Sequence, residues 1–113
     1  MMTNRQLYVR TVLNLYTQMP ATALRARHSD RALADHFFDR RIPIDIVEGA
    51  LLLGSARRMF RCGAALPPIR SLHYFQPIVE ELLAEPPPPT YLGYLRFKVR
   101  STADVHVSQN REP

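Results

Sequence analysis

Prolines divide this chain into short segments, and they constrain its fold more than any other feature of the sequence. Ten of the 113 residues are proline, among them Pro20, Pro43, Pro77 and the run 86–89. Proline has no backbone N–H and its ring clashes with the preceding turn, so the interior of a helix tolerates it poorly. Any helices in this chain must therefore be short, and must begin or end near these positions.

Between the first prolines, apolar residues recur at steps of three and four, which is typical of amphipathic helices. The first helix is expected to begin with a capping box formed by Thr3 and Gln6 and to stop at Pro20. Residues 20–28 form a basic linker, after which Ser29 is expected to cap a second helix.

Two further helices follow from the same pattern. Pro43 suits the first turn of a third helix over 44–60, which is apolar nearly all round and should be the most buried element. A fourth helix is expected within 71–84. Pro77 lies inside it, which predicts either a kink or a short turn leading into a helix that begins near Gln76.

The run 86–89 should form a stiff extended spacer before the last element. Residues 91–100 fit both a helix and a strand, and a helix is favoured because a lone strand would have no partner. We therefore predict an all-α fold, a compact bundle of four to five short helices. It should form a single domain over 1–101, followed by a flexible tail over 102–113.

The chain is strongly basic, with a formal net charge of +5 and a sequence pI near 10.0. Fourteen of its fifteen cationic residues are arginine. The planar guanidinium group pairs phosphate through two hydrogen bonds and stacks on bases, so this composition favours a nucleic-acid partner. A GC-rich genome would also favour arginine codons.

The charges are segregated along the sequence. Residues 1–28 hold four arginines and no acid, and residues 49–79 hold four more without an acid. Phosphate contacts are expected from the second group and from a patch near the end of the chain: Arg57, Arg58, Arg61 and Arg70, then Arg96, Lys98 and Arg100. Cations at the end of a helix also complement its dipole, which is the alternative explanation for the arginines that follow the third helix.

Aromatic residues near these cations offer a second mode of contact. Tyr74, Phe75 and Tyr94 could stack on unpaired bases, which would favour single strands, or could belong to the core.

The sequence contains no pattern typical of an active site, so an enzyme is not expected. The four histidines are scattered, the glycines are too widely spaced for a nucleotide loop, and Cys62 has no evident histidine partner. No metal or other cofactor is predicted. No apolar stretch is long enough to span a membrane and no signal-peptide pattern is present, so we expect a cytoplasmic protein.

The spacing Tyr-x-x-x-Ile-x-x-x-Leu at Tyr74, Ile78 and Leu82 follows the apolar helix expected over 44–60. This arrangement resembles the DnaD-type domain of bacterial and phage primosome proteins, which has tryptophan at the third position. The resemblance implies a compact helical DNA-binding domain that helps to organise replication, and it singles out Tyr74 and Ile78. The same three residues would also suit the core of any amphipathic helix.

These observations together predict a small DNA-binding accessory protein of bacterial replication or of a mobile genetic element. DNA is favoured over RNA as its partner. The alternative is a protein–protein adaptor, or a small helical subunit of a larger nucleoprotein complex that binds nucleic acid jointly with other chains.

Overall fold

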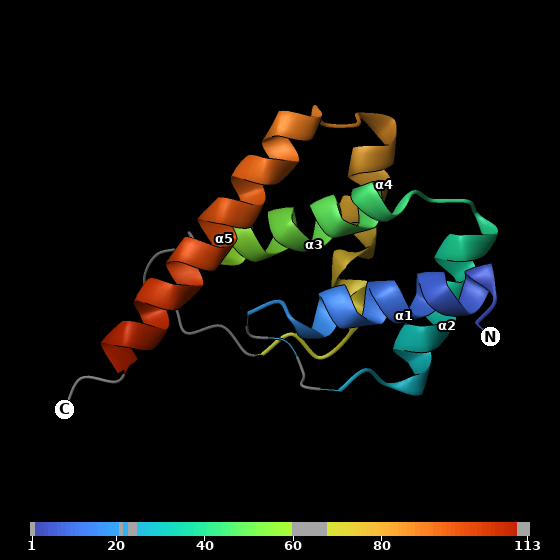
Figure 1. Cartoon of the computed structure of the whole chain (residues 1–113), viewed down its shortest axis with the longest axis horizontal. Helices are drawn as coiled ribbons and strands as arrows, with labels where there is room; N and C mark the ends of the chain where they lie inside the picture. The colour runs from blue at the N-terminus through green and yellow to red at the C-terminus, as the bar shows by residue number, and fades with distance from the viewer. Residues whose placement is uncertain (1, 21, 23–24, 60–67, 111–113) are drawn as a thin grey trace.

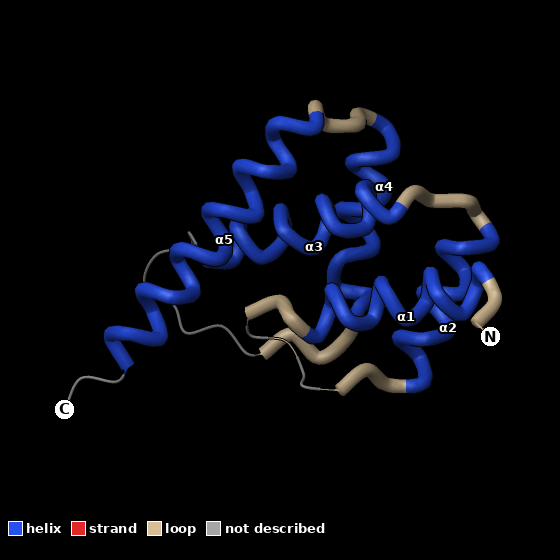
Figure 2. Tube along the Cα trace, viewed as in Figure 1, coloured by secondary structure: helices blue, strands red, loops and turns tan. Residues whose placement is uncertain are grey.

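The computed structural model describes residues 2–20, 22, 25–59 and 68–110, with side chains as far as residue 101. Within these residues the fold consists of α-helices and one short 3₁₀-helix (Figures 1 and 2). In chain order the elements are α1 (Asn4–Thr17), α2 (His28–Asp39), α3 (Ile44–Met59), the 3₁₀-helix η1 (Leu72–Phe75), α4 (Gln76–Ala84) and α5 (Pro89–Asn110). The predicted all-α bundle is confirmed, and the described residues form no strand.

Helix α3 lies at the centre of the bundle, as its mostly apolar sequence predicted. It contacts α1, α4 and α5, while α2 packs on α1 and on η1. Figure 1 shows α3 crossing the middle of the molecule, with α1 and α2 to one side of it and α5 running diagonally along the other.

The core has two parts. The larger part joins α1, α2, α3, η1 and α4, and its largest fully buried side chains include Tyr16, Phe37, Leu51 and Phe75. The smaller part lies between α3 and α5 and contains Leu52, Ala56, Leu95 and Val99. Helix α5 is therefore attached to the rest of the bundle mainly through α3.

The predicted capping box is present at the start of α1. The Thr3 hydroxyl accepts from the Gln6 N–H at 3.1 Å, and the Gln6 side-chain oxygen accepts from the Thr3 N–H at 2.9 Å. The prediction that Ser29 caps α2 is wrong, because the helix begins at His28. The Asp30 carboxylate instead accepts from the Arg27 N–H at 2.8 Å and satisfies the helix terminus from within the first turn.

Asp30 also joins two parts of the chain that are far apart in sequence. Its side chain is fully buried, and its second oxygen accepts from the Leu72 N–H at 2.9 Å and from the Ser71 hydroxyl at 3.3 Å. This carboxylate therefore binds the start of α2 to the start of η1.

Around Pro77 the chain forms a short turn that leads into a helix, which was the second of the two predicted alternatives, and not a kinked helix. The segment begins as η1, and the regular helix α4 starts at Gln76, so Pro77 lies in its first turn. In the first turn of a helix no backbone N–H has an acceptor within the helix, so the absence of this group in proline costs no hydrogen bond.

Residues 91–100 are helical, as favoured from the sequence, and the helix does not end there. Helix α5 continues to Asn110, through most of the segment 102–113 that was predicted to form a flexible tail. The sequence has no proline or glycine between Gly93 and Pro113, so nothing in the covalent chain breaks the helix once it has started. In Figure 1 the later turns of α5 project away from the bundle.

Two glycines in different helices should respond in opposite ways to the same substitution. A Cβ at Gly54 would lie 2.8 Å from ring carbons of the buried Phe75 and from Ile78 Cδ1, whereas a Cβ at Gly93 would meet nothing within 4 Å. We expect Gly54→Ala to lower the free energy of unfolding by about 2 kcal/mol through overpacking. Gly93→Ala should raise it by about 0.5 to 1 kcal/mol through helix propensity. Urea unfolding followed by circular dichroism measures both, and equal effects would contradict this packing.

Candidate nucleic-acid interface

The arginine cluster predicted at the end of α3 is partly neutralised by an acid from another helix. Arg57 donates to both carboxylate oxygens of Glu81 on α4, at 3.0 and 2.6 Å. The Arg57 guanidinium holds the pKa of Glu81 below its usual value through these hydrogen bonds. Arg58 lies beside Arg57 and is half-buried. Arg61 lies outside the described residues.

The second predicted patch lies on α5, where Arg96 is also engaged. Its Nε donates to Glu48 on α3 at 3.0 Å, and its NH2 group donates to the other oxygen of the same carboxylate. Arg96 and Arg100 line a cleft of about 360 Å³ between α5, α3 and the end of α1. Lys98 is half-buried on the same helix.

Acids of α2 and α4 pair in the same way with other arginines. Arg40 binds both oxygens of Glu80, and this contact lowers the pKa of the Glu80 carboxyl. Arg5 of α1 binds Asp35 and Asp39 of α2. Three arginines that look unbalanced in the sequence, Arg5, Arg57 and Arg96, are thus matched by acids of other helices.

The three aromatic residues considered for stacking on bases differ in how far they are buried. Phe75 is buried in the core, edge-to-face with Tyr16 at 6.2 Å between ring centroids, so it is not available to a base. Tyr74 on η1 and Tyr94 on α5 are both exposed.

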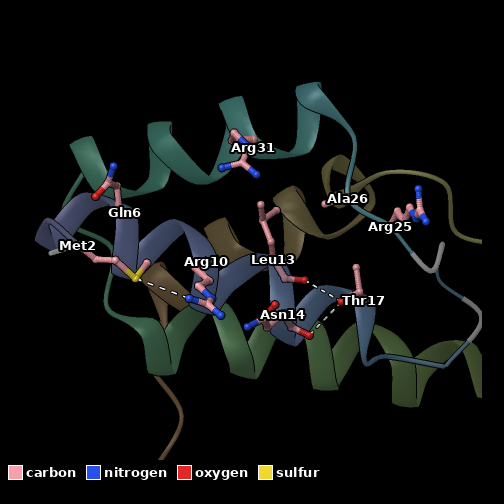
Figure 3. Close-up of a pocket in the computed structure, with 9 residues that line it drawn as sticks. All are labelled: Met2, Gln6, Arg10, Leu13, Asn14, Thr17, Arg25, Ala26 and Arg31. Carbon is pink, nitrogen blue, oxygen red and sulfur yellow. Dashed lines mark hydrogen bonds between the residues drawn. The ribbon is translucent and has the colours of Figure 1, made fainter.

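A groove between α1 and α2 brings together three arginines from different elements. Arg10 comes from α1, Arg25 from the linker and Arg31 from α2. Figure 3 shows Arg31 across from Arg10, with Arg25 at one end of the groove. The groove has a volume of about 690 Å³ and is lined by Met2, Gln6, Arg10, Leu13, Asn14, Thr17, Arg25, Ala26 and Arg31.

Local structure explains why these side chains line the same groove. Arg10, Asn14 and Thr17 share one face of α1, because residues three and four apart lie one above the other on a helix. The linker is held against α1 by the Thr22 hydroxyl, which donates to the carbonyls of Tyr16 at 3.1 Å and Met19 at 2.7 Å.

No acidic side chain lines this groove within the described part of the chain. Arg10 donates to the Met2 sulfur at 3.7 Å, which leaves its charge uncompensated. Arg25 and Arg31 form no ion pair with any carboxylate of the described residues. Since guanidinium groups in an open acid-free groove attract anions, this is the clearest candidate site for phosphate.

Sequence reasoning did not propose Arg10, Arg25 or Arg31 as site residues. Arg10 and Arg25 could have been proposed from the sequence, because both lie in the acid-free segment 1–28. Arg31 belongs to a segment in which acids and arginines roughly cancel, so no sequence pattern distinguished it from its neighbours.

One predicted site residue does lie near this groove. A parallel bridge between Thr22 and Ile69 sets the chain before η1 beside the linker, and the exposed Arg70 follows directly. Arg70 therefore lies alongside the linker that contains Arg25, whereas Arg57 reaches towards α4.

Comparisons of the chain with protein-family models, curated proteins and solved structures found no significant match. The resemblance to DnaD-type domains therefore stays a prediction. In the structure the motif is divided between two elements, with Tyr74 in η1 and both Ile78 and Leu82 in α4.

The described residues include no group of three or more histidine, cysteine, aspartate or glutamate side chains placed to hold a metal ion. Among the helices of the described ranges, none is both long and apolar enough to cross a membrane.

Proposed function

We propose that this protein binds nucleic acid, with DNA as the favoured form, by holding backbone phosphates in the groove between α1 and α2. The observation that supports this proposal is that Arg10, Arg25 and Arg31 line one groove in which no described side chain is acidic. The exposed Arg70 follows the bridge between Ile69 and Thr22 and so adds a further cation beside the linker that contains Arg25.

The chemistry of arginine fits a phosphodiester backbone. A guanidinium group donates two parallel hydrogen bonds to a phosphate and keeps its charge at any physiological pH. Contacts of this kind fix the position of the backbone without reading bases, so the groove would bind with little sequence preference. An accessory role in bacterial replication or in a mobile element, suggested by the motif at Tyr74, Ile78 and Leu82, is part of this proposal.

The affinity should depend steeply on salt, because each phosphate contact releases a condensed counterion. For the three groove arginines, the slope of log K against log salt should be about −3 for duplex DNA and about −2 for single strands. Fluorescence anisotropy measures this with labelled single-stranded DNA, duplex DNA and RNA of matched length and sequence, between about 50 and 200 mM salt.

The relative affinities for the three probes show which form of nucleic acid the protein prefers. Tighter binding to RNA than to either form of DNA would contradict DNA as the partner. Failure to bind any of the three probes in a salt-dependent way would overturn the proposed function as a whole.

A further inference from the structure

Helix α5 has two faces of different character, and one of them exposes aromatic rings. Leu95 and Val99 are buried against α3. Tyr91, Tyr94 and Phe97 recur every three residues on the helix and remain 37%, 54% and 69% exposed. An aromatic stripe of this exposure is unusual for the surface of a small domain, because large apolar groups left in water cost free energy.

The first two rings of the stripe already lie nearly parallel. The centroids of Tyr91 and Tyr94 are 6.2 Å apart and their planes differ by 26°. The two rings are therefore roughly parallel neighbours along the helix, and Phe97 follows with the largest exposed fraction of the three.

The stripe lies in a stretch of sequence that has cations and no acids. Residues 86–103 contain Arg96, Lys98 and Arg100 and no aspartate or glutamate. Arg96 binds Glu48, while Arg100 is exposed. Aromatic faces interleaved with cations are the combination that single-strand-binding surfaces use, since the rings stack on bases and the cations attract the backbone.

We propose that the α5 aromatic stripe, formed by Tyr91, Tyr94 and Phe97, stacks on the unpaired bases of single-stranded nucleic acid. This inference rests on the proposed function and specifies its ligand. Duplex DNA buries its base faces in its own stack and offers none to such a surface. A second copy of this chain is a poorer occupant, because the cations of the two α5 helices would be brought close together.

The test compares Tyr94→Ala/Phe97→Ala with the wild-type protein and with Leu7→Ala, which removes an exposed apolar side chain from α1. We expect the double variant to bind single-stranded DNA about tenfold or more weakly, from the known effect of removing a stacked ring. Its affinity for duplex DNA and the salt slope for single strands should be unchanged, because no charge is altered. Leu7→Ala should bind both probes like the wild type.

Tyrosine fluorescence provides a second readout, because the chain has no tryptophan. Stacking on bases should quench the emission of Tyr91 and Tyr94 when single-stranded DNA binds. Tyr91→Phe/Tyr94→Phe removes the two tyrosine fluorophores of the stripe, so it should lose most of the quenching that accompanies binding.

The outcomes separate this inference from the proposed function. Wild-type affinity of Tyr94→Ala/Phe97→Ala for single strands, with duplex binding intact, would overturn the role of the stripe and leave the groove untouched. Sedimentation showing a dimer that this variant converts to monomer would also overturn it, in favour of a second copy on α5. Absence of binding to every probe by the wild type would instead refute the proposed function.

Discussion

Replacing Arg10, Arg25 and Arg31 together by glutamine should weaken nucleic-acid binding by about two to three orders of magnitude, since each arginine–phosphate contact contributes roughly 1 to 1.5 kcal/mol. The salt slope should become shallower by about 2 to 3, because about one counterion fewer is released per lost contact. Anisotropy titrations at several salt concentrations give both quantities. The three side chains are exposed, so the fold should be retained.

The matched control is Arg57→Gln/Arg58→Gln/Arg61→Gln, in the cluster predicted from the sequence. Both triple variants lower the formal net charge from +5 by three, to +2, so the general attraction of the protein for a polyanion falls equally. We expect the control to lose much less affinity, since Arg57 already pairs with Glu81. A larger loss in the control than in the groove variant would place the site at the end of α3.

Asp30→Ala should be the most destabilising single substitution proposed for this chain, lowering the free energy of unfolding by about 3 kcal/mol. The carboxylate accepts from the N–H groups of Arg27 and Leu72, and its removal leaves buried donors without partners. For a domain of this size the melting temperature should fall by roughly 10 to 15 °C. Thermal unfolding followed by circular dichroism measures this directly.

Asp45→Ala provides the comparison, because Asp45 also lies in the first turn of a helix but is exposed. Only its favourable interaction with the helix dipole is lost, which contributes about 0.3 to 1 kcal/mol. Asp30→Asn keeps one acceptor oxygen and should fall between the two variants. An Asp30→Ala protein as stable as Asp45→Ala would show that the buried carboxylate does not hold α2 to η1.

The helices were predictable because their signals are local. The Thr3 and Gln6 capping box, and the effect of Pro77 on where a helix can begin, depend on residues within one turn. The end of α5 was less predictable, because the polar segment after Ser101 lacks both a strong helix signal and a helix breaker. The N-cap of α2 was predicted at Ser29, two residues after its actual position at Arg27. Ser29 and Asp30 are both good acceptors, and the sequence does not tell which of them a distant segment also needs.

The candidate site was less predictable than the fold. Net charge and its segregation pointed to an anionic partner, and the acid-free segment 1–28 already contained Arg10 and Arg25. The pairing of charges could not be predicted, because Arg57 and Arg96 meet Glu81 and Glu48 only after α4 and α5 pack on α3.

By itself, the sequence determined that this chain forms an all-helical bundle around an apolar central helix and has excess positive charge. Proline chemistry and helical periodicity act locally, and the net charge is a sum over the whole chain. Only the tertiary structure decided which arginines remain without an acid and which aromatic rings remain exposed. Coulombic pairing and burial depend on distances between side chains, and residues such as Arg10 and Arg31 become neighbours only when α1 and α2 pack together.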